Sequence, residues 1–114
     1  MTPQPFSAVR SLTPDGVTVV TLRGDIDQDV GTEVRQALLP TGTPDPFTVV
    51  DLASVSFMDT AGINALILAH RAAASRDGWI RLAACSPTIL RVLDVLGIAG
   101  VMRCYPTVQD ALGD

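Results

Sequence analysis

Apolar residues recur along the chain with two different periods, and they divide it into strand-like and helix-like segments. Short runs rich in β-branched residues predict strands, which we place at residues 6–12, 17–22, 47–52, 79–84 and 101–105. Apolar residues spaced three or four positions apart predict helices between these strands. The helices are expected to begin after residue 27, near residue 60 and at residue 86, with a last helical turn over residues 107–112.

The same spacing predicts which face each helix buries. The first helix has its apolar stripe at Val30, Val34, Ala37 and Leu38. The second is expected to bury Ile63, Leu66, Ile67, His70 and Ala74. The third is expected to bury Ile89, Leu90, Leu93 and Leu96.

Capping residues mark the ends of two of these helices. Asp27 is placed to accept hydrogen bonds from the free N–H groups at the start of the first helix. Ser86 and Pro87 suit the N-cap and the first helical position of the third helix, since proline there loses no hydrogen bond. Gly97 can adopt the left-handed conformation that ends such a helix.

The order of the elements predicts an α/β fold in a single domain spanning residues 1–114. The Pro and Gly of the 13–16 turn reverse the chain, so the first two strands should be antiparallel. The later strands alternate with helices, which predicts parallel pairing through right-handed crossovers in a mixed β-sheet flanked by helices. Residues 1–5 are expected to be a flexible N-terminus, and residues 40–46 form a Gly- and Pro-rich connection.

Composition excludes several classes of function. Eight Lys plus Arg against twelve Asp plus Glu give a net charge of −4, so direct nucleic-acid binding is not expected. All eight cations are Arg, and therefore no lysine can form a Schiff base or serve a phosphate-binding loop. Neither a phosphate-loop motif nor a dinucleotide motif occurs in a suitable context.

Membrane insertion and export are not expected either. The longest apolar stretch, residues 63–74, is interrupted by Asn64, His70 and Arg71 and is shorter than the ~20 residues that a spanning helix needs. The first seven residues have neither a basic segment nor an apolar core. We therefore expect a soluble, cytoplasmic protein.

Metal-binding and catalytic sites find little support among the polar residues. Asp25, Asp27 and Asp29 have the spacing that opens a calcium loop, but Val30 stands where that loop needs glycine and Gln36 where it needs glutamate. We interpret the three acids as a helix-entry turn at the positive end of a helix dipole. The single histidine, residue 70, is interpreted as a core-edge side chain. We predict no metal site and no catalytic residues.

The two cysteines, Cys85 and Cys104, lie at or near the ends of the last two predicted strands. A redox-sensitive disulfide is one alternative. In a cytosolic protein two such cysteines are more often buried thiols that act as small hydrophobic residues, and this is the state we expect.

The segment from Ser56 to Ile63 stands out because it leaves a predicted buried strand and enters a helix. Thr60 falls at the start of that helix, where amide N–H groups have no partner within the helix. One interpretation is that Thr60 caps the helix and Gly62 relieves crowding. The other is that Thr60 offers an exposed hydroxyl beside Asp59 that can be phosphorylated, with the new charge facing the positive end of the dipole.

Three stretches resemble the STAS-domain anti-sigma factor antagonists, and the resemblance runs from about Val17 to Leu112. They are L-R-G-D-I-D at 22–27, V-V-D-L-A-S-V-S-F-M-D-T-A-G-I at 49–63 and S-P-T-I-L-R-V-L-D-V-L-G-I at 86–98, of which the middle one is the most specific. The resemblance implies a STAS-like mixed sheet. It also implies that the unphosphorylated protein binds a kinase-type anti-sigma factor, and that this binding frees a sigma factor. Phosphorylation would then release the partner.

The same resemblance implies which residues act. Thr60 would be the phosphorylated residue, Asp59 would shape its site, and Asp27 matches an acid that the family places nearby. Phosphate would come from ATP bound by the partner, an anti-sigma factor with serine/threonine kinase activity, so no cofactor is expected in this chain. The predicted partner-binding residues are Asp27, Asp59, Thr60, Ala61, Gly62 and Asn64.

Two departures leave alternatives open. Thr60 stands where serine is commoner in the family, and Ala61 replaces a frequent second hydroxyl residue. The D-T-A-G sequence also resembles STAS subunits of bacterial lipid-transport ABC complexes, in which the same threonine would contact an ATPase subunit. A STAS module that senses a small molecule is a third possibility.

Overall fold

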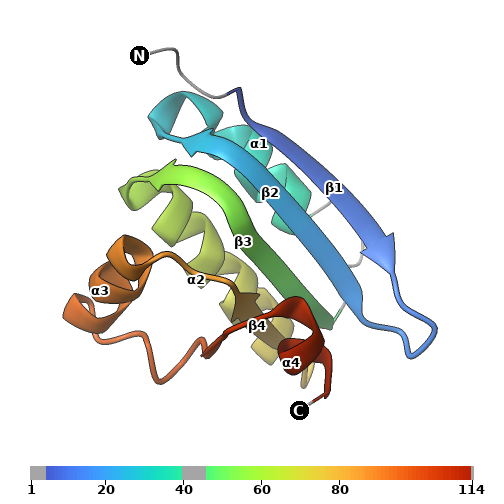
Figure 1. Cartoon of the computed structure of the whole chain (residues 1–114). Helices are drawn as coiled ribbons and strands as arrows, with labels where there is room; N and C mark the ends of the chain where they lie inside the picture. Colours follow the sequence, from blue (N-terminus) through green and yellow to red (C-terminus); the bar gives the residue numbers. More distant parts are fainter. Residues whose placement is uncertain (1–4, 40–45, 114) are drawn as a thin grey trace.

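Five strands form one sheet in chain order, with helices on both of its faces (Figure 1). The computed structural model describes residues 5–39 and 46–113, so most of the expected N-terminal segment and of the 40–46 connection lies outside the described residues. The strands are β1 (Ser7–Leu12), β2 (Thr18–Ile26), β3 (Phe47–Met58), β4 (Trp79–Ala83) and β5 (Cys104–Tyr105). The helices are the 3-10 helix η1 (Gln28–Val30), α1 (Gly31–Leu38), α2 (Thr60–Ala74), α3 (Pro87–Val95) and α4 (Val108–Gly113).

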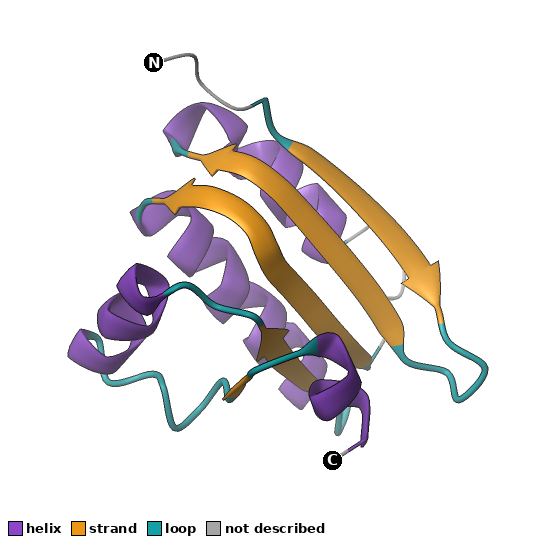
Figure 2. Cartoon of the chain, in the orientation of Figure 1, coloured by secondary structure: helices purple, strands orange, loops and turns teal. Residues whose placement is uncertain are grey.

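The pairing of the strands confirms the predicted mixed sheet. β1 pairs antiparallel with β2, and each later pair, from β2·β3 to β4·β5, is parallel. The crossovers that connect one parallel strand to the next contain helices, and Figure 2 shows these helices lying against the sheet. Every parallel strand therefore ends at the same edge of the sheet, and loops that follow these ends are brought together there.

The main core lies between the sheet and helices α1, α2 and α3. Alternate residues of β2 and β3, such as Val20, Leu22 and Leu52, meet the buried stripe of α2 around Leu66. This face also receives Ile89 of α3. Alternation along the strands and a helical period in α2 thus converge on one apolar layer.

The opposite face of the sheet is covered in part by α4. A smaller apolar cluster there joins Val19 and Val49 to Ala111 of the helix. Arg81 holds this layer together, because its guanidinium lies 3.7 Å from the centre of the Trp79 ring and donates a 2.8 Å hydrogen bond to the Ala111 carbonyl.

Strands β2 and β3 are longer than predicted. The sequence prediction ended them at residues 22 and 52, whereas they continue to Ile26 and Met58. Register shifts interrupt their pairing between Thr21 and Arg23 and again between Gly24 and Asp25. The extra residues at both shifts lie in β3, so its buried residues Val50, Leu52 and Val55 no longer alternate strictly, and the periodicity that predicts a strand is lost while β3 continues. In β2 the alternation of buried residues runs unbroken to Ile26, and its end is hidden by Gly24 and Asp25, which are residue types depleted in strands.

The predicted helix faces are partly wrong. Ile89 and Leu93 of α3 are buried as expected, but Leu90 is 44% exposed and Leu96 is 52% exposed. In α2 the last predicted stripe position, Ala74, is exposed. In α3 only Ile89 and Leu93 enter the main core, with Val92 partly buried beside them, so the buried stripe of this helix is narrower than the predicted one.

The helix ends follow the sequence more closely. The Ser86 side chain accepts a hydrogen bond from the Ile89 amide at 3.2 Å, and Pro87 is the first residue of α3. Gly97 follows the helix with φ of +72°, as predicted for a left-handed cap. His70 is half-buried, in agreement with its interpretation as a core-edge side chain.

The expectation of two free thiols is wrong. Cys85 and Cys104 form a disulfide, with their Cα atoms 6.5 Å apart. Parallel pairing of β4 with β5 sets Cys104 opposite Leu82, three residues before Cys85, and so brings the two cysteines close in space. Their separation of 19 residues in the sequence does not reveal this proximity.

In the part of the chain that the structure describes, no helix has the length and apolar character required to cross a bilayer.

Replacing Gly78 with alanine should destabilise the fold. A Cβ at this position would lie 1.9 Å from the Pro46 carbonyl oxygen, and that oxygen also accepts a 2.7 Å hydrogen bond from the Trp79 amide. We expect Gly78→Ala to lower the free energy of unfolding by about 1–3 kcal/mol in urea titrations, as overpacking does. Gly100→Ala is the matched control, since its Cβ would meet no atom within 4 Å. Equal stability of the two variants would contradict the packing at Pro46.

Candidate functional site

The junction between β3 and α2 is built by Asp59. Its carboxylate accepts a 2.8 Å hydrogen bond from the Ala61 amide and so caps the start of α2. Its own amide donates to the Ile26 carbonyl at 2.9 Å, which links the junction to the end of β2. One residue therefore ends β3, begins α2 and ties both to the neighbouring strand.

Thr60 follows as the first residue of α2, and its side chain is exposed. The interpretation of Thr60 as the helix cap is wrong, because Asp59 has that role. The cause is visible in the backbone, since Asp59 is extended with φ of −98° and ψ of −168°, whereas Thr60 is already helical. The hydroxyl of Thr60 thus lies at the positive end of the helix dipole, on the surface.

Gly62 allows the start of α2 to approach the sheet closely. It is buried, and a Cβ at this position would lie 2.5 Å from Met58 Cγ and 2.8 Å from Ile26 Cγ2. The expectation that Gly62 relieves crowding agrees with these distances. Gly62 therefore fixes the height at which Thr60 and Ala61 stand above the strand ends.

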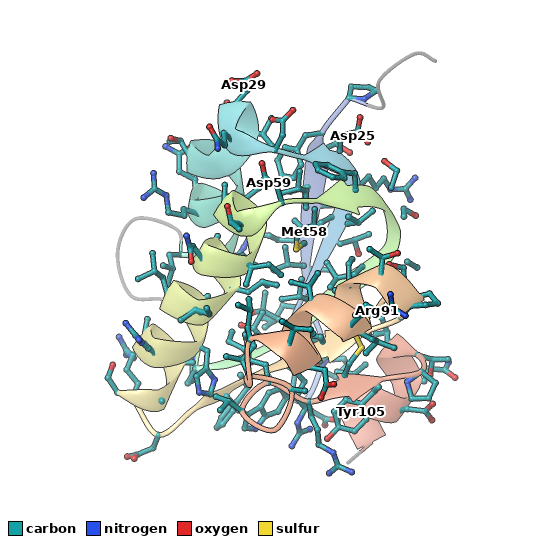
Figure 3. The ribbon with its side chains drawn as sticks, turned by 90° about the vertical axis from the view of Figure 1, so that its left-hand side faces the viewer. Asp25, Asp29, Met58, Asp59, Arg91 and Tyr105 are labelled. Atoms are coloured by element: carbon teal, nitrogen blue, oxygen red, sulfur yellow. A yellow bond between two sulfur atoms is a disulfide. The ribbon has the colours of Figure 1, made fainter. Side chains whose placement is uncertain are left out.

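Acidic side chains gather at the same end of the molecule. Figure 3 shows Asp25, Asp29 and Asp59 near one another at one end, with Tyr105 at the other. Asp27 accepts a 2.9 Å hydrogen bond from the Asp29 amide and caps η1, and Asp25 accepts one from the Ser56 hydroxyl. Asp27 thus lies at a helix entry, but the helix that it caps is η1; α1 begins at Gly31, and its N-cap residue Val30 makes no side-chain hydrogen bond. Asp25 belongs to β2. Among the described residues, no group of three or more His, Cys, Asp or Glu is arranged to hold a metal ion.

Two grooves lie beside the first turns of α2, lined by sequence neighbours of Thr60. The first, of about 240 Å³, lies between the beginnings of α1 and α2 and is polar. It is lined by Gln28, Gly31, Thr32, Arg35, Ala61 and Asn64. The second, of about 360 Å³, is mostly apolar and lies between the end of β3, α2 and the start of α3. It is lined by Ser56, Phe57, Met58, Ile63, Ser86, Thr88, Ile89 and Val92.

The predicted site residues come together around these grooves. Thr60 and Asn64 are exposed on the first turns of α2, Ala61 lines the polar groove, and Asp27 caps the neighbouring η1. Gly62 is buried, so within this chain it positions the helix.

Sequence reasoning missed several residues of the same surface. Arg35 of α1 lines the polar groove, and Phe57, which is 52% exposed, lines the apolar one. Ser86 and Ile89, at the start of α3, line the same apolar groove. The available signal was topological, since loops after parallel strands meet at one edge.

Asp59 and Thr60 should separate in their effects on stability. Asp59→Ala removes the N-cap of α2 and should lower the free energy of unfolding by about 1 kcal/mol. Thr60→Ala removes an exposed side chain at the adjacent position and should change it by less than about 0.5 kcal/mol. Chemical denaturation of both variants tests the assignment, and a loss for Thr60→Ala as large as that for Asp59→Ala would make Thr60 the capping residue.

Comparison with known proteins agrees with this architecture. An anti-sigma factor antagonist from Mycobacterium paratuberculosis is 26% identical with a TM-score of 0.84, covering 98% of this chain and 95% of that one. SpoIIAA in its unphosphorylated form is 20% identical with a TM-score of 0.75, covering 93% of each chain, and SpoIIAA of Bacillus is also solved phosphorylated. A sulfate transporter family protein from Wolinella succinogenes is 18% identical with a TM-score of 0.75, covering 90% of this chain and 87% of that one.

The five-stranded sheet, with its first pair antiparallel and the rest parallel, is the arrangement that these neighbours share with the chain. The family model described as the STAS domain matches residues 8–111. This range includes all five strands except the first residue of β1, and it ends within α4. The chain belongs to the STAS domain family.

Proposed function

We propose that this chain is an anti-sigma factor antagonist, which binds a kinase-type anti-sigma factor while unphosphorylated and releases it when Thr60 is phosphorylated. The observation that carries the proposal is the position of Thr60, exposed on the first turn of a helix that Asp59 already caps. The 26% identical mycobacterial neighbour, named as an anti-sigma factor antagonist, supports the same role.

Phosphorylation at this position changes the surface much more than the fold. A phosphate adds about −1.5 to −2 charge at pH 7, and the positive end of the α2 dipole tolerates it. The hydrogen bonds that hold the helix start, from Ala61 to Asp59 and from Asp59 to Ile26, do not involve the Thr60 hydroxyl. The charge does enter a surface that already contains Asp27 and Asp59, so a partner seated there faces increased negative charge.

The proposed partner contacts Asp27, Asp59, Thr60, Ala61 and Asn64, with Gly62 beneath them. ATP bound by the partner supplies the phosphate, and this chain supplies only the acceptor hydroxyl and its presentation. The role therefore requires no catalytic residues in this chain, and it places the protein in the cytoplasm with its partner.

A second candidate function is that of a STAS subunit in a transport complex, such as a lipid-transport ABC complex. The likeness to a sulfate transporter family protein favours this class. In such a complex the start of α2 contacts an ATPase subunit, and Thr60 stays unmodified.

Thr60→Glu should weaken binding of the anti-sigma factor at least tenfold, because it places a permanent negative charge inside the interface. Its melting temperature should stay within a few degrees of that of the wild type, since the charge favours the helix start. Titration calorimetry and thermal unfolding test both expectations. The matched control is Gln109→Glu, which adds the same charge to an exposed position in the first turn of α4, on the other face of the sheet. Equal affinities of the two variants for the anti-sigma factor would show that Thr60 does not lie in the interface.

Incubation with ATP and the partner should add one phosphate to Thr60, as read by mass spectrometry of tryptic peptides. Thr60→Ala should abolish the modification, and Thr60→Ser should retain it. If Thr60 stays unmodified and the chain co-purifies from its host with an ABC ATPase, the transport-subunit function replaces the one proposed.

A further inference from the structure

The Cys85–Cys104 disulfide joins the two ends of the segment that contains α3. Cys85 lies two residues after the end of β4, and Cys104 begins β5. The intervening residues 86–103 comprise α3 and its connection to the sheet margin. Both sulfur-bearing residues are half-buried at the edge of the main core, and neither is enclosed by it.

The remaining attachments of this segment are few. Its fully buried side chains are Ile89, Leu93 and Met102, and Val92 and Ile98 are partly buried against the core. At its far end the segment pairs with β4 through β5, which is two residues long. The Leu82 amide donates to the Arg103 carbonyl there, and the Ala84 amide donates to the Tyr105 carbonyl, both at 2.9 Å. With so short a ladder, the covalent link is a large part of what fixes the segment.

The residue before Cys85 is held in an unfavourable conformation. Ala84 has φ of +57°, a left-handed value that residues with a Cβ rarely adopt. Such a conformation persists only where the surrounding structure imposes it. The disulfide at the adjacent Cys85 is one such constraint on Ala84, so its reduction favours a change of the Ala84 backbone toward negative φ.

The start of α3 is also a wall of the apolar groove beside Thr60. Ile89 and Val92 line this groove together with Ile63, and Ile63 lies one turn after Thr60 on α2. A shift of α3 therefore changes the shape of the groove directly. Greater freedom of this wall lowers affinity for anything bound there, because the wall must be ordered on binding.

We propose that Cys85–Cys104 is a reversible redox latch that sets the order of α3 and, through it, the affinity of the groove for the partner. The part of the proposal that concerns the partner rests on the function proposed above. In a protein with cytoplasmic partners, a disulfide is usually transient or redox-sensing, in contrast to the permanent links of secreted domains.

The chemistry is a thiol–disulfide exchange with a dithiol reductant. One thiolate of the reductant attacks a sulfur of the disulfide, the Cys85–Cys104 bond breaks, and a mixed disulfide forms. The second thiol of the reductant then displaces the remaining cysteine. Two electrons and two protons end on the Cys85 and Cys104 thiols, and the reductant becomes a disulfide.

The latch is tested by hydrogen exchange on the oxidised protein and on the same protein reduced with dithiothreitol. Reduction should speed the exchange of amides in residues 86–103 at least tenfold, leave those of β2 and β3 unchanged, and lower the melting temperature by about 10 °C. The Cys85→Ser/Cys104→Ser double variant should resemble the reduced protein and should not respond to dithiothreitol. Unchanged protection of residues 86–103, or thiol labelling that finds both cysteines free without reductant, would overturn the latch.

A second measurement tests the link to the partner. Reduction should weaken binding of the unphosphorylated protein to the anti-sigma factor at least threefold, and the double variant should bind as weakly in both conditions. Equal affinity despite faster exchange would overturn the coupling of α3 to the groove. If the anti-sigma factor binds neither form, the proposed function fails, while the exchange data still decide whether the disulfide orders α3.

Discussion

The contact between the first turn of α2 and the ends of β2 and β3 is the constraint on which the surface depends. At Gly62 the helix comes so close to Ile26 and Met58 that no side chain fits between them. Asp59 completes the contact with one hydrogen bond to the helix and one to the Ile26 carbonyl. The packing and hydrogen bonds of this junction are made by Gly62 and Asp59, so they do not depend on the exposed side chains of Thr60 and Asn64.

Under the proposed function, that division lets a modification at Thr60 act on the partner while the fold is kept. Residues below the junction are buried in a close-packed core, so a change in the volume of one side chain disturbs the packing of its neighbours. Thr60 and Asn64 stand above it, exposed and beside two grooves. A charged group added here acts on whatever approaches the surface, since neither the cap nor the helix–sheet contact uses the altered atoms.

The fold and the centre of the candidate site could be predicted from the sequence, because local signals there agree with the tertiary structure. Ser86 and Asp27 are capping residues with clear sequence positions, and both cap helices in the structure. The extension of β2 to Ile26 could not be predicted, since Gly24 and Asp25 are residue types depleted in strands. The extension of β3 to Met58 could not be predicted, since bulges shift its apolar period. The exposure of Leu90 depends on how α3 is set against the core, and the Cys85–Cys104 bond depends on strand pairing. Neither property is encoded in a local window.

The strand order β1-β2-β3-β4-β5 repeats the order of synthesis. As the chain leaves the ribosome, each new strand can therefore add to the open edge of those already made, without waiting for a later segment to be inserted between them. Most of the sheet can then assemble while translation continues, which limits the time that an unpaired edge is available for aggregation. The apolar cluster beneath α4 forms only after α4 has followed these strands out of the ribosome.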